Sequence, residues 1–284
     1  MSRKTRKFLT IILAVMFLTS TALLIRHSLD TAAAEESYQS AAEIASRPKE
    51  SAGQQEPVEE TESTEPEVTE PQTMWIVAPV EEDEYMKKLA NINLAALRET
   101  NPDVLGWIYL PNTLINYPIV QGEDNQYYLN YTWDNKKSVA GAIFLETTNA
   151  PDLTDFRSIV YGHNMANSTM FGSLHRYSSK SYWEQYPYVY LVTDEGVLRY
   201  DIYSSYKAAV DSKTYALDLE ETGKRASFIS LTKDESELDT NIMPAVTDRI
   251  LTLSTCMGSS THRRVVHAKL TMVEVEIKKD SPQG

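Results

Sequence analysis

Apolar and polar residues are arranged differently in successive parts of this chain. Residues 8–25 are apolar or small and contain no charged side chain. Residues 31–73 are dominated by Glu, Pro, Ser, Thr, Gln and Ala, and residues 74–284 carry short apolar runs separated by turn residues. We therefore expect an apolar helix within residues 1–30, a disordered acidic stalk over residues 31–73 and one folded domain over residues 74–284.

The apolar run at residues 8–25 is about long enough to cross a bilayer core as a helix. Four basic residues lie between positions 3 and 7, and the positive-inside rule then leaves the N-terminus in the cytosol and the rest of the chain outside. A cleaved signal peptide is the alternative, with the three alanines at positions 32–34 as an A-x-A-like cleavage site. The run exceeds a usual signal core, so we favour an uncleaved, single-pass membrane anchor followed by an extracytoplasmic domain.

Residues 31–73 are too polar to bury enough apolar surface to offset the entropy lost on ordering. They contain eleven glutamates against only Arg47 and Lys49 as basic residues. Prolines and repelling carboxylates favour an extended chain. We expect a stalk that holds the following domain away from the lipid.

The domain at residues 74–284 begins with a helix, predicted by apolar residues at helical spacing from Tyr85 to Leu97 and ended by Asn101-Pro102. A surface helix is predicted over residues 224–238. Eight stretches rich in β-branched and aromatic residues predict strands at 104–110, 115–120, 141–145, 158–161, 188–192, 197–206, 249–255 and 264–276. This pattern indicates a mainly β fold in which the strands close into a barrel.

Composition excludes several classes of protein. The formal net charge is −13, which argues against a nucleic acid partner because phosphate binding needs a basic face. Cys256 is the single cysteine, so an intramolecular disulfide and a multi-cysteine zinc site are excluded. The acidic residues show no EF-hand spacing, and we expect neither a metal nor another cofactor.

Alternation along residues 249–256 places Cys256 at the end of a strand, on the polar face that it shares with Thr252 and Ser254. That position suits an accessible nucleophile, although a lone cysteine is more often a small buried residue. A thiol nucleophile needs a proton partner. His163 is the favoured one of the five histidines, because it follows a predicted strand through Gly162; the others are His27, His175, His262 and His267.

These residues carry a family resemblance. Leu253-Ser254-Thr255-Cys256, followed by the arginine-containing residues 261–266, resembles the active-site signature of sortases, the membrane-anchored cysteine transpeptidases of Gram-positive bacteria. Residues 161–165, Tyr-Gly-His-Asn-Met, resemble their histidine motif. Further matches resemble class B sortases in particular, and they lie at residues 101–108, 116–121, 141–145 and 168–172. The resemblance covers about residues 84–276.

The resemblance implies an eight-stranded sortase-type barrel with an N-terminal helix and an inserted helix before the cysteine strand. It also implies that Cys256 attacks a threonyl carbonyl in the C-terminal sorting signal of a secreted protein and forms a thioacyl enzyme. His163 would transfer protons, and an arginine would stabilise the oxyanion. The acceptor would be an amino group of peptidoglycan, of its lipid-linked precursor or of a pilin lysine.

Strand alternation distinguishes the two adjacent arginines. Arg264 shares the apolar face of Val266 and Ala268, so Arg263 points towards the groove and is the predicted catalytic residue. A bulge would reverse the assignment to Arg264. Ser254 and Thr255 are the predicted substrate-binding residues, and a small polar residue on a solvated strand is the alternative for Ser254.

Two other functions use the same residues differently. A cysteine peptidase of another fold would transfer the acyl group to water, and it would be expected to carry its cysteine near a helix N-terminus. A catalytically silent, stalked binding domain would need no accessible thiol. The sequence leaves the sorting motif and the acceptor amine open.

Overall fold

The computed structural model describes residues 3–49, 83–256 and 261–274. Its helices are α1 (Arg3–Ala45), α2 (Glu84–Leu89), α3 (Leu94–Arg98), α4 (Lys180–Gln185) and α5 (Thr222–Asp234), with short 3-10 helices at Tyr127–Leu129, Gly172–Ser178 and Lys213–Tyr215. Its strands are β1 (Val104–Tyr109), β2 (Asn116–Val120), β3 (Ile143–Leu145), β4 (Arg157–His163), β5 (Tyr188–Thr193), β6 (Gly196–Ala209), β7 (Ile250–Cys256) and β8 (His262–Glu274).

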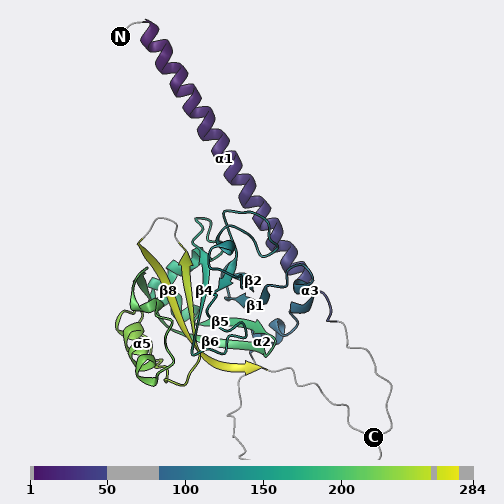
Figure 1. The fold of residues 1–284 in the computed structure, drawn as a ribbon, viewed down its shortest axis with the longest axis vertical. Helices are drawn as coiled ribbons and strands as arrows, with labels where there is room; N and C mark the ends of the chain where they lie inside the picture. Colours follow the sequence, from purple (N-terminus) through teal and green to yellow (C-terminus); the bar gives the residue numbers. More distant parts are fainter. Residues whose placement is uncertain (1–2, 50–82, 257–260, 275–284) are drawn as a thin grey trace, which may run out of the picture.

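The strands close into one barrel in the order β1-β2-β3-β4-β7-β8-β6-β5 (Figure 1). The pairs β2–β3 and β4–β7 are parallel, and the other neighbours are antiparallel. Alternate positions fill the interior with apolar side chains such as Val160, Leu253 and Val266, all fully buried. The predicted mainly β barrel is confirmed, and each predicted strand overlaps an observed one.

Helix α5 covers the outer face of the barrel next to β6 and β7. Its Phe228 packs with Tyr203 of β6 and Ile250 of β7 in a second apolar cluster. The helix begins two residues earlier than predicted and ends four residues earlier, and Leu238 instead joins the main core. The inserted helix before the cysteine strand is therefore present.

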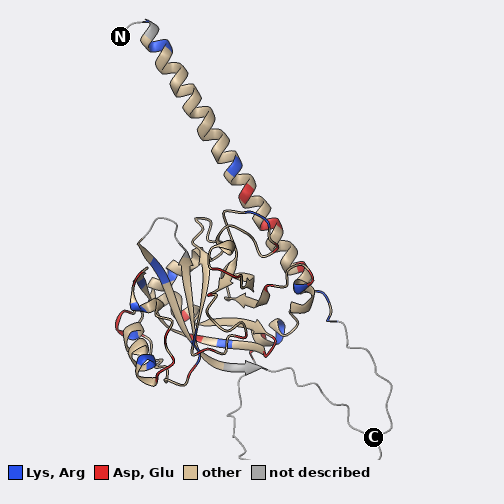
Figure 2. Cartoon of the chain, in the orientation of Figure 1, with Lys and Arg blue, Asp and Glu red and all other residues tan. Residues whose placement is uncertain are grey.

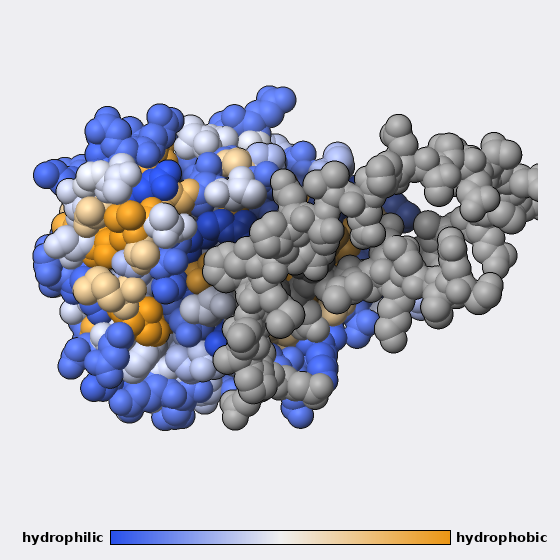
Figure 3. Space-filling model, turned by 90° about the horizontal axis from the view of Figure 1, so that it is seen from below, coloured by the Kyte–Doolittle hydropathy of each residue, from blue (hydrophilic) through white to orange (hydrophobic). Residues whose placement is uncertain are grey.

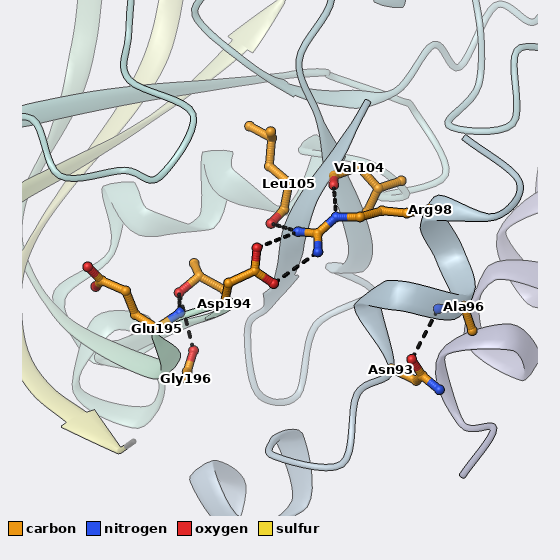
Figure 4. A network of polar contacts seen from close by, with 9 residues as sticks. Asn93, Ala96, Arg98, Val104, Leu105, Asp194, Glu195 and Gly196 are labelled. Atoms are coloured by element: carbon orange, nitrogen blue, oxygen red, sulfur yellow. Dashed lines mark hydrogen bonds and ion pairs between the residues drawn. The ribbon is translucent and has the colours of Figure 1, made fainter. Parts of the chain in front are cut away.

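The predicted N-terminal helix is in fact two short helices. Asp83 caps α2, and Asn93 caps α3 by accepting a hydrogen bond from the Ala96 N–H at 3.1 Å. Arg98 at the end of α3 then forms a bidentate ion pair with Asp194, at 2.9 Å for both N–O distances, and also donates to the carbonyl groups of Val104 and Leu105 (Figure 4). The ion pair between Arg98 and Asp194 thus links α3 to the β5–β6 hairpin.

Helix α1 differs most from the sequence prediction. It continues to Ala45, so the prediction of a disordered stalk is wrong for residues 31–45. Alanine and glutamate are strong helix formers, and one stripe of side chains at helical spacing is buried against the barrel: Ala34, Ser37, Tyr38, Ala41 and Ala45. Residues 46–49 also contact the domain, since Lys49 Nζ donates to Ala90 O at 2.8 Å. Residues 50–73 of the predicted stalk lie outside the described residues.

The preceding part of α1 projects away from the barrel and exposes large apolar side chains on all sides. Phe17 and Leu24, for example, are 71% and 67% exposed, and this stretch carries no charge between its basic ends (Figure 2). Seen from the opposite end, the surface of the domain is largely hydrophilic, with a smaller hydrophobic area on the α5 side (Figure 3). Among the described residues, α1 is the one helix with the length and composition to cross a membrane.

Candidate active site

The candidate site lies where two neighbouring parallel strands end. The register of β4 and β7 pairs His163 with Cys256, the last residue of each strand. Parallel strands in register end at the same edge of a sheet. The predicted nucleophile and its proton partner therefore occupy adjacent positions at one rim of the barrel. The predicted exposure of the Cys256 side chain lies outside what the structure describes.

The imidazole of His163 is held by a main-chain carbonyl. Its Nε2 lies 2.7 Å from Leu129 O, and because a carbonyl oxygen can only accept, Nε2 carries the proton. Nδ1 is then the nitrogen that can take up and release a proton. Gly141 packs closely against this pair at a φ of +56°, and a Cβ there would lie 3.0 Å from His163 Cδ2, so the close approach requires glycine.

The two adjacent arginines of β8 lie in different environments, as the alternation predicts. Arg263 lines a groove and donates from Nη1 to Thr255 O at 3.2 Å, at the residue before Cys256. Arg264 is buried, 7% exposed, and pairs with Glu237 at 2.8 Å. The buried ion pair gives Arg264 a structural role.

Ser254 and Thr255 are both buried. The alternative given for Ser254, a small polar residue on a solvated strand, is wrong, because the residue is fully buried and its hydroxyl lies 3.0 Å from Tyr215 Oη. The Thr255 hydroxyl accepts from the Arg264 N–H at 3.0 Å. Ser254 therefore contacts Tyr215, which lines the groove. Thr255 contacts Arg263, which also lines it, through its main-chain carbonyl group.

The groove beside these residues has a volume of about 300 Å³. Its polar end is organised by Glu146, which is 6% exposed and accepts from Asn125 Nδ2 at 2.6 Å and from Tyr161 Oη at 3.1 Å. The remaining walls include apolar and aromatic side chains: Leu129, Phe144, Val210, Tyr215 and Leu217. Apolar walls with a few fixed polar groups suit a bound peptide segment.

Sequence reasoning missed Glu146, Asn125 and Tyr161. Tyr161 had a usable signal, because it lies two residues before His163 and therefore on the same face of β4. Glu146 and Asn125 come from separate loops, and only the closed barrel brings them together. A larger hollow of about 680 Å³ lies between α3 and the β5–β6 hairpin, but none of the predicted site residues lines it.

One further histidine of the barrel, on strand β8, lies outside the site. His267 is fully buried behind the rim, with Nδ1 at 3.0 Å from Thr252 Oγ1 and Nε2 at 3.2 Å from Tyr206 Oη. Burial, together with the nearby charge of Arg157, lowers the pKa of His267 to about 3. His267 is therefore a neutral core residue at physiological pH.

A thiol and an imidazole on adjacent strand ends, with a guanidinium anchored beside them, are typical of a cysteine-dependent acyl-transfer enzyme. The Sortase domain family matches residues 108–271. Sortase B of Staphylococcus aureus is 32% identical over 181 residues, which cover 63% of this chain and 74% of that protein. Sortase B of Listeria monocytogenes is 33% identical over 183 residues, covering 62% and 73%.

Solved structures agree with the sequence comparisons. The Staphylococcus aureus sortase B–substrate complex superposes with a TM-score of 0.62 at 32% identity, covering 64% of this chain and 85% of that one. Sortase B of Bacillus anthracis in complex with AAEK1 gives 0.58 at 32% identity, covering 62% and 82%. The chain belongs to the sortase family and, within it, to the class B sortases. It is a cysteine transpeptidase, and no finding favours a peptidase of another fold or a silent binding domain.

Proposed function

We propose that this class B sortase uses Cys256 as its nucleophile, His163 as general acid and base, and Arg263 as the donor that stabilises the oxyanion. The observation that supports this assignment best is the pairing of His163 with Cys256 in the β4–β7 register. Arg263 adds to it, because its guanidinium is bound to the carbonyl group directly before the cysteine.

In the first half of the reaction, the Cys256 thiol gives its proton to His163 Nδ1. The resulting thiolate attacks the threonyl carbonyl of a sorting signal, and a C–S bond forms. The carbonyl electrons move to oxygen, where the permanent charge of Arg263 stabilises the tetrahedral oxyanion; such donors contribute about 3 kcal/mol elsewhere. Collapse of the intermediate breaks the peptide C–N bond. His163 Nδ1 gives its proton to the leaving amine, and the thioacyl enzyme remains.

In the second half, an incoming amine attacks the thioacyl carbonyl. His163 Nδ1 removes the proton of this amine, and the tetrahedral intermediate expels the Cys256 thiolate. The product is an amide between the threonyl carboxyl group and the acceptor. Acceptance of an amine rather than water distinguishes this reaction from peptide hydrolysis.

The substrates are sorting-signal proteins and amine acceptors, as for sortases generally. We infer that the signal lies extended in the groove beside Tyr161 and Arg263, with Tyr215, bound to Ser254, as part of its wall. A substrate-binding role of Ser254 and of Thr255 stays a prediction. The acceptor we propose is an amino group of peptidoglycan, of its lipid-linked precursor or of a pilin lysine.

We also propose that α1 is an uncleaved, single-pass anchor with a cytosolic N-terminus. The apolar run ends at residue 25 and the buried stripe begins at Ala34 in the same helix, a separation of roughly 13 Å at 1.5 Å per residue. A continuous helix over this distance supports a domain held close to the lipid surface rather than on a long stalk.

The test is a product assay with the full chain in detergent micelles. A peptide carrying a candidate sorting signal is incubated with and without an amine acceptor, using the parent, Cys256→Ala and His163→Ala. We expect amine-dependent ligation by the parent and no product from Cys256→Ala. Cleavage at the same rate with and without the amine, or full activity of either variant, would contradict the assignment.

A further inference from the structure

The buried end of α1 contacts the segments that surround His163. The ring of Tyr38 is 8% exposed and packs edge-on against Tyr117, with ring centroids 5.0 Å apart. Its hydroxyl donates to Gly141 O at 2.6 Å. The neighbouring Ser37 hydroxyl donates to Asp134 Oδ1 at 2.7 Å. The anchor helix is therefore fixed to the barrel by directional bonds as well as by apolar packing.

Gly141 connects the Tyr38 hydroxyl to the imidazole. A Cβ on Gly141 would lie 2.8 Å from Leu129 O and 3.0 Å from His163 Cδ2, so the glycine main chain is in close contact with both. Leu129 O is the acceptor of the His163 Nε2 proton. Because interiors are close-packed, a shift of Gly141 changes the position of the imidazole and of the carbonyl that fixes its tautomer.

A second connection runs through Tyr117, on which the Tyr38 ring packs. Tyr117 Oη accepts from the Met170 N–H at 3.2 Å, and Met170 forms a bridge with Asn164, the residue after His163. The next residue, Phe171, donates its N–H to His163 O at 2.9 Å. Tyr38 is therefore connected to the side chain of His163 by contacts through Gly141. It is connected to the main chain of His163 by contacts through Tyr117, Met170 and Phe171.

We propose that Tyr38 is a positioning residue for His163, so that the membrane-anchor helix is itself part of the apparatus that orients the imidazole. The inference rests on the proposed role of His163. It predicts that the enzyme loses turnover when the Tyr38 contact is broken, even while the anchor, the barrel and the groove stay intact.

The test compares Tyr38→Phe with Ser37→Ala in the full chain in detergent micelles. Tyr38→Phe keeps the packing of the ring on Tyr117 and removes the hydrogen bond to Gly141. Ser37 belongs to the same buried stripe of α1, and Ser37→Ala removes its hydrogen bond to Asp134. We expect Tyr38→Phe to lower kcat about five- to tenfold, the effect of one net hydrogen bond, with KM within about twofold of the parent. Ser37→Ala should leave both constants within about twofold.

A smaller folded fraction would also lower the apparent kcat at an unchanged KM, so kcat is calculated per folded enzyme. Thermal unfolding of each variant shows whether it is folded at the assay temperature. If Tyr38→Phe does not fold, Tyr117→Phe decides; it removes the acceptor of the Met170 N–H and should lower kcat about threefold. An unchanged kcat in a folded Tyr38→Phe, or an equal fall in Ser37→Ala, overturns the inference.

His163→Ala in the same assay distinguishes a failure of the positioning role of Tyr38 from a failure of the proposed catalytic role of His163. Loss of activity in His163→Ala together with an unchanged Tyr38→Phe refutes the positioning role alone. Near-parent activity in His163→Ala refutes the proposed function on which it rests.

Discussion

His163 and Cys256 are register partners at the ends of the adjacent parallel strands β4 and β7. Six consecutive pairs, from Arg157 with Ile250 onwards, precede them in the same register. The relative position of the two residues is thus set by a ladder of main-chain hydrogen bonds inside a closed barrel rather than by loops. Reactive groups on such rigid elements are held in place before the substrate arrives.

The first prediction separates the two arginines of β8. Arg263→Ala should lower transpeptidation by about two to three orders of magnitude, since the charge beside the oxyanion is lost. Arg264→Ala should stay within about tenfold of the parent but lower the free energy of unfolding by about 2 kcal/mol, because Glu237 loses its buried partner. Rates and urea unfolding curves of both variants check this, and the reverse order of the two rates would show that the assignment is wrong.

Ser254 and Tyr215 should act as one unit, because their hydroxyl groups lie 3.0 Å apart. Ser254→Ala and Tyr215→Phe are each expected to lower the acylation rate about tenfold, which corresponds to a loss of about 1.4 kcal/mol. The double variant should be no worse than either single one. Fully multiplicative effects in this cycle would mean that the two hydroxyl groups act independently.

Glu146 should affect substrate binding more than turnover. Glu146→Ala frees Asn125 and Tyr161 from their shared acceptor, and we expect kcat/KM to fall about tenfold, mainly through KM. The exposed Glu123 offers a matched control, and Glu123→Ala should match the parent. A fall confined to kcat would instead place Glu146 in the chemistry.

His267 should make the fold sensitive to acid. Its pKa is lowered to about 3 by burial, so below about pH 6.5 the unfolded chain binds a proton that the folded chain does not. The resulting stability is present above pH 6.5 and is lost as the pH falls towards 3, at up to about 1.4 kcal/mol per pH unit. Urea unfolding at pH 7, 6, 5 and 4 should show a shallower pH slope for His267→Gln.

The exposed His175 is the control for that measurement. His175→Gln should keep the slope of the parent, since its imidazole is not enclosed by the core. An identical slope in His267→Gln and the parent would show that His267 does not carry the acid sensitivity.

The sequence predicted the barrel because strand alternation and turn residues are local signals. Alternation also separated Arg263 from Arg264, since β8 has no bulge there to break it. It could not predict the burial of Ser254, which depends on Tyr215 from a distant segment. The prediction of disorder for residues 31–45 rests on their acidic composition. It overlooks the helical spacing of Ala34, Tyr38, Ala41 and Ala45, the residues that α1 buries against the barrel. Composition describes a whole segment, whereas docking needs only one face of a helix.

The most direct test of the account is intact-protein mass spectrometry of the full chain after mixing with a sorting peptide. We predict an adduct with the mass of the acyl fragment, carried by Cys256, that decays faster when an amine acceptor is added. Cys256→Ala should form no adduct, and His163→Ala should form it far more slowly than the parent. An adduct on Cys256→Ala, or a decay that is indifferent to the amine, would contradict the thioacyl transpeptidase mechanism.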